Sequence, residues 1–362
     1  MTEKKIVTIV GARPQFIKAA PVSRELKNPD LLLKEVMIHT GQHFDANMSD
    51  VFFNDLDIPT PDYNLSVSGG SHGHMTARML MGIEDILTSE KPDWVLVYGD
   101  TNSTLAGSLA ASKLHIPIIH IEAGLRSFNN KMPEEINRIV SDRIASIHFC
   151  TSDLAVENLR HEGITENVYN TGDVMYDTAL FYSADAHKNV ILLETLEIEK
   201  DNFILVTCHR AENTDNRQKL ENILSALHLI SNDINVVFPL HPRTRKLIDE
   251  YNLSHYLSSL KIISPLPYVD MIVLEKNAKA IITDSGGVQK EAYFFKTPCI
   301  TIREETEWLE TLEGNANIVV GTNKEKIIDR IKGDHSISWP FENLYGDGKA
   351  SRKIVDHIKR VS

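Results

Sequence analysis

The chain has 362 residues, of which 42% are hydrophobic and 24% are charged. This is ordinary globular composition, which excludes a disordered or fibrous chain, and at roughly 100–200 residues per domain the length favours two domains. No apolar run reaches the length of about 18 residues that a transmembrane helix needs. The net charge of −12 argues against nucleic acid as a partner, because phosphate binding needs a basic surface.

Short apolar strands alternate with amphipathic stretches through the first half of the chain. The run at 4–10 predicts a first β-strand rather than a signal peptide, because Gly-Ala-Arg-Pro follows it at once. Amphipathic helices are expected at 15–27 and 102–114. The other expected strands are 34–40, 93–99, 116–122, 146–151 and 168–172. This alternation predicts a parallel, doubly wound α/β sheet.

A second strand series begins near residue 202. Residues 173–200 predict two helices and a connection between them. The strands expected after this connection are 202–209, 234–241, 260–266, 278–284 and 297–303. We therefore predict two α/β domains, residues 1–173 and 174–347. Residues 348–362 predict a last helix that packs back on the first domain.

The cysteine and histidine patterns argue against a metal or disulfide centre. Cys150, Cys208 and Cys299 are sparse, odd in number and placed in or beside predicted strands. This is typical of reduced core thiols in a cytoplasmic protein. His72 and His74 form a His-x-His pair, but no third ligand follows at a suitable spacing, so we expect no metal.

Polar residues gather where strands of the first domain end, which is where open α/β sheets bind ligands. Arg13 follows the first strand and Lys18 lies one turn later, so both are expected to face the crevice. Asp100 follows the strand at 93–99 and is either the N-cap of the next helix or an acid–base group. Glu122 ends the strand at 116–122 and forms either a structural ion pair with Arg126 or part of a site.

The segment at 132–138 predicts a helix with Pro133 at its first position and two acids in its first turn. Glu134 and Arg138 are neighbours one turn apart on one side of this helix. That side meets either water or a cleft between the domains, and the pattern favours water. The residues predicted to form the buried stripe on the other side are Ile136, Ile139, Val140 and Ile144.

Two strand ends of the second domain favour anion binding. His209 ends the strand at 202–209 and is followed by Arg210, and His241 ends the strand at 234–241 with Arg243 close by. A single histidine is usually structural. Two histidines at matching strand ends, each beside an arginine, favour an anion site.

The helix expected after the strand at 278–284 begins with an open backbone. Exposed N–H groups and the helix dipole at Ser285, Gly286 and Gly287 make a ready anion site. Glu291, one turn later, can accept hydrogen bonds from sugar hydroxyls. The G-x-G-x-x-G dinucleotide fingerprint is absent, which argues against NAD.

Together these motifs resemble the non-hydrolysing UDP-N-acetylglucosamine 2-epimerases over nearly the whole chain. The resemblance implies two Rossmann-like domains with the site in the cleft between them, the GT-B arrangement, and no nicotinamide cofactor. It rests on Gly11-Ala12-Arg13-Pro14 with Lys18, Thr40-Gly41-Gln42-His43, Gly99-Asp100-Thr101, Glu122-Ala123-Gly124-Leu125-Arg126, Pro133-Glu134-Glu135 with Asn137-Arg138, His209-Arg210, and Asp284-Ser285-Gly286-Gly287 with Glu291.

The resemblance also implies a role for each matching residue. Asp100, Glu122 and Glu134 match the catalytic carboxylates, and His209 matches a residue near the diphosphate that is also implicated in catalysis. The matches to UDP-binding positions are Arg13, Ser285, Gly286, Gly287 and Glu291. The matches to other substrate-binding positions are Lys18, Arg138, Arg210 and His241.

The implied reaction makes chemical sense of this set of residues. The C2 proton of such a sugar has no adjacent carbonyl, so a carboxylate cannot remove it directly. Expelling UDP from C1 gives oxocarbenium character that acidifies the C2 proton, and a carboxylate base then completes the elimination to a glycal. UDP re-adds with protonation from the other face. The scheme needs anion stabilisation, acids or bases near both faces, and exclusion of water by closure of the two domains.

Some positions depart from the branch of the family that acts on UDP-N-acetylglucosamine. That branch has an acid where this chain has Gln15. It also has Arg-Pro after a Thr-Glu pair, whereas here Trp308 follows Thr-Glu. Trp308 either lines a pocket or packs in the core. The changes look more like the branch acting on UDP-2,3-diacetamido-2,3-dideoxyglucuronic acid. The additional carboxylate of that substrate needs another cation. The candidates are Arg243, Arg245 and Lys131.

The family also has a second, regulatory UDP-N-acetylglucosamine pocket. Gln42 and His43 match it, but the segment at 68–72 lacks the expected arginine. The motifs therefore match the regulatory pocket only in part, and they do not determine whether substrate activates this chain.

We therefore expect a cytoplasmic, homodimeric UDP-sugar 2-epimerase that serves surface-polysaccharide precursors, with no cofactor and no contact with nucleic acid or membrane. Three alternatives stay open: a hydrolysing epimerase that releases N-acetylmannosamine and UDP, a GT-B glycosyltransferase, and a non-catalytic nucleotide-sugar sensor.

Overall fold

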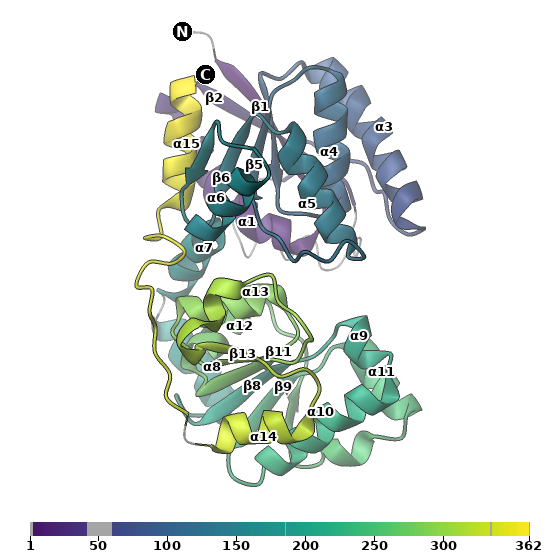
Figure 1. The fold of residues 1–362 in the computed structure, drawn as a ribbon, viewed down its shortest axis with the longest axis vertical. Helices are drawn as coiled ribbons and strands as arrows, with labels where there is room; N and C mark the ends of the chain where they lie inside the picture. The colour runs from purple at the N-terminus through teal and green to yellow at the C-terminus, as the bar shows by residue number, and fades with distance from the viewer. Residues whose placement is uncertain (1–2, 42–59, 185, 334, 362) are drawn as a thin grey trace. The chain divides into compact units, whose positions relative to one another are not determined.

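The computed structural model describes residues 3–41, 60–184, 186–333 and 335–361 (Figure 1). Gln42 and His43 lie outside these ranges. The chain folds into two compact units. Unit 1 comprises Met1–Thr178 with Asn343–Ser362, and unit 2 comprises Ala179–Glu342. The divisions fall at 178 and 343, whereas the sequence analysis placed them at 173 and 348.

Unit 1 is built on a seven-stranded sheet in the order β3-β2-β1-β4-β5-β6-β7, in which all neighbouring strands are parallel. Figure 1 shows α3, α4 and α5 side by side along one flank of this unit. The strands are β1 (Lys4–Val10), β2 (Leu33–His39), β3 (Tyr63–Asn64), β4 (Trp94–Tyr98), β5 (Ile118–Ala123), β6 (Ile147–Cys150) and β7 (Val168–Asn170). The helices are α1 (Arg13–Leu26), α3 (His72–Glu90), α4 (Asn102–Lys113), α5 (Pro133–Ile144), α6 (Asp153–His161), the first half of α7 (Val174–Ser183) and α15 (Ala350–Val361), with a short 3₁₀ turn at Pro29–Leu31.

Unit 2 is built on a six-stranded parallel sheet in the order β10-β9-β8-β11-β12-β13. The strands are β8 (Phe203–Thr207), β9 (Asn235–Pro239), β10 (Lys261–Ile263), β11 (Ala280–Thr283), β12 (Cys299–Thr301) and β13 (Asn317–Val319). The helices are α8 (Ala186–Thr195), α9 (Ala211–Thr214), α10 (Arg217–Ile230), α11 (Pro242–Glu250), α12 (Tyr268–Asn277), α13 (Gly286–Phe294) and α14 (Lys324–Lys332), with 3₁₀ turns at Ser254–Leu257 and Leu309–Asn315.

The predicted α/β class and the order of the predicted strands are confirmed. The central strands are buried throughout rather than on alternate residues, as is typical of parallel sheets covered on both faces, and Ile6 to Val10 of β1 are all buried. The sequence analysis missed β3 and β13. Both are very short, and neither contains the long apolar run by which the other strands are recognised.

The strand orders fix where a ligand can bind. In each sheet the order reverses once, between β1 and β4 in unit 1 and between β8 and β11 in unit 2. Loops that leave neighbouring strands at such a reversal diverge to opposite faces and open a crevice at the carboxyl ends of the strands. The candidate site segments lie at these points. In unit 1, β1 is followed by residues 11–13 and β4 by residues 99–100. In unit 2, β8 is followed by residues 208–210 and β11 by residues 284–287.

The C-terminal helix α15 belongs to unit 1, where it packs against α1. Ile354, Val355 and Ile358 are its buried apolar residues, while Val361 is half exposed. Asp177 of α7 caps its N-terminus, because the carboxylate accepts hydrogen bonds from the backbone N–H groups of Ala350 at 3.0 Å and Ser351 at 2.7 Å. Among the described residues, no helix is both long and apolar enough to cross a membrane.

Substituting Asp177 by Ala should selectively loosen α15. The change removes the hydrogen bonds of the cap, so we expect a loss of about 1–2 kcal/mol in the free energy of unfolding and faster amide exchange confined largely to residues 350–361. The matched control is Asp356→Ala, an exposed position in the middle of α15, which should change the free energy of unfolding by less than about 1 kcal/mol. Equal effects of the two substitutions in chemical denaturation and hydrogen exchange would contradict the capping role.

Candidate functional site

The turn after β1 is closely packed against the end of β4. A Cβ atom on Gly11 would lie 2.0 Å from Oγ1 of Thr40, so only glycine fits at the turn. Gln15 then ties the two strand ends together. Its Oε1 accepts the backbone N–H of Gly11 at 2.8 Å, and its Nε2 donates to the Tyr98 carbonyl at 3.0 Å. An ionised glutamate at this position could not make the second bond, because a carboxylate has no hydrogen to donate.

Glu122 forms a buried ion pair with Lys18, whose Nζ lies 2.6 Å from Oε1 of the carboxylate. The sequence analysis offered Arg126 as the structural partner of Glu122, and this is wrong: Arg126 pairs with Asp142 and Glu162 instead. Glu122 has a backbone φ of +68° at a break in the pairing of β5 with β6. Such strained conformations of non-glycine residues concentrate at functional sites.

Asp100 also faces a cation, but it is not a helix cap. Thr101 is the N-cap of α4, with its hydroxyl accepting from the Thr104 N–H at 3.4 Å. The Asp100 carboxylate instead forms an ion pair with Arg138, which also contacts Glu135 at 2.8 Å. Asp100 keeps 23% of its side chain exposed, so the carboxylate is reachable by a ligand.

Helix α5 buries a polar face, contrary to the predicted apolar stripe. Its buried residues are Glu135, Asn137, Arg138, Ser141 and Asp142. Ile136 is 49% exposed, and Ile139, Val140 and Ile144 are only partly buried. Arg138 is therefore in the interior rather than in water, and Glu134 is partly exposed in the first turn. The prediction failed because buried polar side chains of α5 find partners in one another and near the ends of β4 and β5, as Arg138 does with Glu135, Asn137 with the Asp100 carbonyl and Asp142 with His120.

Asp142 is the centre of the buried polar network in unit 1. Its carboxylate contacts Nδ1 of His120 at 2.7 Å, Nη1 of Arg126 at 2.7 Å and the backbone N–H of Gly124 at 3.2 Å. The other ring nitrogen of His120 lies 2.7 Å from the carbonyl of Gly99. Burial by itself would raise the pKa of Asp142, but His120 and Arg126 hold it below its usual range. Asp142 thus fixes the turns that carry Asp100 and Glu122, a role that the sequence analysis did not assign to it.

Asp284 is the corresponding buried carboxylate of unit 2. It accepts the backbone N–H groups of His209 at 3.0 Å and Arg210 at 2.9 Å, and the Asn213 side chain at 3.3 Å. Nδ1 of His209 lies 3.4 Å from the same carboxylate. Asp284 therefore orients the half-exposed His209 ring. The contact uses Nδ1 and does not involve Nε2.

His241 follows β9, the strand that pairs with β8 on the side away from β11. Its Nδ1 accepts the backbone N–H of Arg243 at 3.2 Å and so caps α11. Burial and the neighbouring charges of His209 and Arg243 lower the pKa of His241. The Arg243 guanidinium is itself engaged by Asp215 and by the Thr214 hydroxyl.

The turn at 285–287 leads directly into α13. The Ser285 side chain makes no capping hydrogen bond, so the first N–H groups of the helix are not satisfied by it. A Cβ atom on Gly286 would lie 2.5 Å from Oε1 of Glu307 and 3.3 Å from Nε1 of Trp308, which explains the glycine. Trp308 packs in the interior with the ammonium of Lys290 over its ring, 4.2 Å from the centroid.

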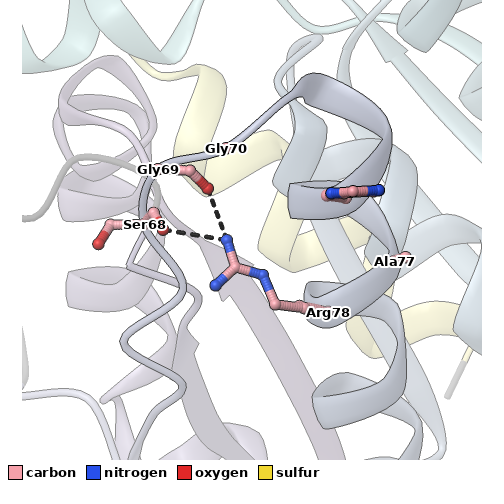
Figure 2. Close-up of a pocket in the computed structure, with 6 residues that line it drawn as sticks. Ser68, Gly69, Gly70, Ala77 and Arg78 are labelled. Atoms are coloured by element: carbon pink, nitrogen blue, oxygen red, sulfur yellow. Dashed lines mark hydrogen bonds between the residues drawn. The ribbon is translucent and has the colours of Figure 1, made fainter.

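A hollow of about 540 Å³ lies beside the N-terminus of α3. It is lined by Ser68, Gly69, Gly70, His74, Ala77 and Arg78. Figure 2 shows Arg78 directed at the preceding loop, where Nη2 donates to the carbonyls of Ser68 at 3.0 Å and Gly69 at 2.6 Å. The sequence analysis noted a missing arginine in this loop and overlooked Arg78, which reaches the loop from the next helix.

Within the ranges that the structure describes, no three His, Cys, Asp or Glu side chains lie close enough together to hold a metal ion. His72 contacts Asn102 at 3.1 Å. Cys150, Cys208 and Cys299 are free, buried thiols, as expected.

The chain matches the family described as UDP-N-acetylglucosamine 2-epimerase over residues 24–359. A relative from Methanococcus maripaludis, named UDP-N-acetylglucosamine 2-epimerase homolog, is 53% identical over 99% of this chain and 100% of its own length. UDP-2,3-diacetamido-2,3-dideoxy-D-glucuronate 2-epimerase of Pseudomonas aeruginosa is 50% identical over the same shares. The solved structure of Methanocaldococcus jannaschii UDP-GlcNAc 2-epimerase in complex with UDP-GlcNAc and UDP is 42% identical, with a TM-score of 0.88 over 98% of this chain and 99% of that one.

Substituting Asp142 by Ala should severely destabilise unit 1. Removing this carboxylate leaves His120 and Arg126 without their shared buried partner, which costs about 3–5 kcal/mol in the free energy of unfolding. Ser141→Ala is the matched control, because the buried Ser141 hydroxyl has no hydrogen-bond partner among the described residues, and it should change stability by less than about 1 kcal/mol. Denaturant unfolding of both variants tests this, and a small effect of Asp142→Ala would show that the network does not hold the strand ends.

Proposed function

Because the chain belongs to the UDP-N-acetylglucosamine 2-epimerase family, we propose that it interconverts the C2 epimers of a UDP-2-acetamido sugar without releasing the free sugar. The observation that carries the proposal is the pair of acid–cation contacts at the β1/β4 reversal of unit 1. There, Glu122 faces Lys18 and Asp100 faces Arg138. Epimerisation removes a proton from one face of C2 and adds one to the opposite face. This requires two acid–base groups that are held separately.

The diphosphate is assigned to unit 2. The backbone N–H groups at 285–287 and the dipole of α13 favour a dianionic leaving group. His209 and Arg210, which Asp284 holds in place, lie at the end of the neighbouring strand β8. Glu291, one turn into α13, accepts hydrogen bonds from the ribose hydroxyls of the nucleotide.

The proton transfers are assigned to unit 1. The bond from C1 to the diphosphate oxygen breaks, and its electrons leave with UDP. One carboxylate then takes the C2 proton, and the electrons of the C–H bond form the C1–C2 double bond of the glycal. In the return step, a second acid protonates C2 from the opposite face while UDP re-forms the bond to C1. Asp100, Glu122 and the partly exposed Glu134 are the groups proposed for these transfers, with Lys18 and Arg138 balancing their charge.

The substrate we favour is UDP-2,3-diacetamido-2,3-dideoxyglucuronate, with UDP-N-acetylglucosamine as the second candidate. The 50% identity to the Pseudomonas enzyme over whole chains supports this order, as do Gln15 and the buried Trp308. The three cations considered for the carboxylate of the uronate sugar differ in whether an acid of the protein already pairs with them. Arg243 is paired with Asp215, whereas Arg245 and Lys131 are exposed. A homodimer in the cytoplasm stays a prediction.

Replacing the carboxylate of Asp100 or of Glu122 should greatly slow C2 proton exchange and leave the affinity for the nucleotide nearly unchanged. We expect Asp100→Asn and Glu122→Gln each to slow exchange of the C2 proton with deuterated water by about 10²–10⁴-fold, with the Kd of UDP changed less than about threefold, which corresponds to well under 1 kcal/mol. Glu157→Gln, an exposed site on α6, is the control and should behave as wild type. Undiminished exchange in both variants, followed by NMR, would refute the assigned roles.

The products separate the proposal from its rivals. Incubating the protein with each candidate UDP-sugar should yield a nucleotide-linked epimer, and an isotope placed in the oxygen that bridges C1 and phosphorus should scramble within the diphosphate during turnover. Free sugar with an equal amount of UDP would instead identify a hydrolysing epimerase. Turnover only with an added acceptor would identify a glycosyltransferase.

A further inference from the structure

Helix α7 is one of the two segments through which the chain passes between the units. Its residues up to Thr178 belong to unit 1, and those from Ala179 to Ser183 belong to unit 2. On the unit 2 side, the carbonyl of Ser183 accepts a hydrogen bond at 3.0 Å from Nζ of Lys276, which lies in α12. On the unit 1 side, the hydroxyl of the buried Thr178 donates to the carbonyl of Ile17 in α1 at 2.9 Å. One helix is therefore attached by hydrogen bonds to both units.

A proline inside α1 explains why the carbonyl of Ile17 is available for this contact. In an α-helix each carbonyl accepts the N–H group of the residue four positions later. For Ile17 that residue is Pro21, which has no N–H group to donate. The Thr178 hydroxyl thus supplies a donor to a carbonyl that lacks its regular helical partner. The same hydroxyl lies 3.0 Å from the carbonyl of Val174 in α7, but the regular helical partner of that carbonyl is the backbone N–H of Thr178.

The Thr178 contact lies one residue away from an ion pair of the candidate site. Lys18 directly follows Ile17 in α1, and its Nζ lies 2.6 Å from Oε1 of Glu122. Both side chains of this pair are buried, so their contact depends on the position of the α1 turn. A shift of α7 along α1 either breaks the Thr178 hydrogen bond or carries this turn with it.

We propose that Thr178 is a positioning residue, which holds the turn of α1 that carries Lys18 in register with the helix that leads to unit 2. The inference rests on the proposed function, which assigns Glu122 to proton transfer and the diphosphate to unit 2. Its consequence is that a displacement of α7 reaches the Lys18–Glu122 pair through one hydrogen bond. The effect of Thr178 on exchange of the C2 proton is therefore exerted through Lys18.

Exchange of the C2 proton with deuterated water tests the inference in the full-length protein. It is followed by NMR with saturating UDP-2,3-diacetamido-2,3-dideoxyglucuronate, or with UDP-N-acetylglucosamine if only that sugar turns over. Thr178→Val keeps the β-branched shape and removes the donor. The exchange rate should fall by about two- to tenfold, the net worth of one hydrogen bond, while the Kd of UDP changes by less than about twofold.

Two matched variants accompany Thr178→Val. Thr178→Ser keeps the hydroxyl and should exchange the C2 proton at the wild-type rate. Thr297→Val removes a 2.9 Å hydrogen bond from another buried threonine to a backbone carbonyl, that of Glu275 in unit 2. It should leave the exchange rate unchanged. The comparison of Val with Ser at position 178 decides the proposal without any further variant.

Two further backgrounds show how the hydroxyl acts. Pro21→Ala gives the carbonyl of Ile17 an N–H donor. In this background Thr178→Val should lower the denaturation midpoint less than it does in the wild type, yet it should still slow exchange, because α7 stays unlinked from α1. In a Lys18→Met background Thr178→Val should cause no further loss of exchange, because the side chain that it positions is gone.

Undiminished exchange in Thr178→Val, an equal loss in Thr178→Ser, or an undiminished further loss in the Lys18→Met background would overturn the inference. Full recovery of exchange in Thr178→Val by Pro21→Ala would also overturn it, since the hydroxyl would then only satisfy a carbonyl. Glu122→Gln separates these results from a failure of the proposed function. Wild-type exchange in Glu122→Gln removes the assignment of Glu122 itself, whereas slow exchange in Glu122→Gln with wild-type exchange in Thr178→Val removes the role of Thr178 alone.

Discussion

A carboxylate taken out of water must be paired with cations or N–H groups, and this requirement organises the strand ends of both units. In unit 1, Asp142 gathers His120, Arg126 and the backbone of Gly124. In unit 2, Asp284 gathers the backbone of the turn that carries His209. Asp284 directly follows β11, whereas Asp142 reaches the strand ends of unit 1 from helix α5. Asp142 and Asp284 thus fix the residues that are proposed to contact the substrate, although neither is proposed to contact it.

The acids proposed to transfer protons are held differently from these central carboxylates. Asp100 faces Arg138 and Glu122 faces Lys18, and Asp100 stays partly exposed. A flexible cation thus holds the Asp100 carboxylate while part of it remains accessible. Glu122 reaches its position only through a left-handed backbone at a break in β5. The surrounding packing must stabilise this strained turn, which is consistent with the close approach of Gly99, where a Cβ atom would lie 3.3 Å from Oε1 of Glu122.

Buried acids in this protein have opposite pKa shifts, depending on their neighbours. The pKa of Asp142 is held below its usual range, because His120 and Arg126 offset the cost of its burial. The pKa of Glu275 is raised well above its usual range, because it is fully buried and the charge of Glu291 adds to that cost. The ionisation of a buried carboxyl group therefore depends on which neighbours the fold supplies.

Local apolar runs and motifs that are contiguous along the chain were enough to predict the α/β class, the order of most strands and the family. It did not identify the partner of Glu122, since Lys18 lies 104 residues away in the chain. It also misjudged α5, where a periodicity rule assumed that the apolar side is buried and the buried residues are polar ones satisfied by distant strand ends. Only folding could reveal that Asp142 pairs with His120 and Arg126, because these side chains come from separate parts of the chain and meet in one buried volume.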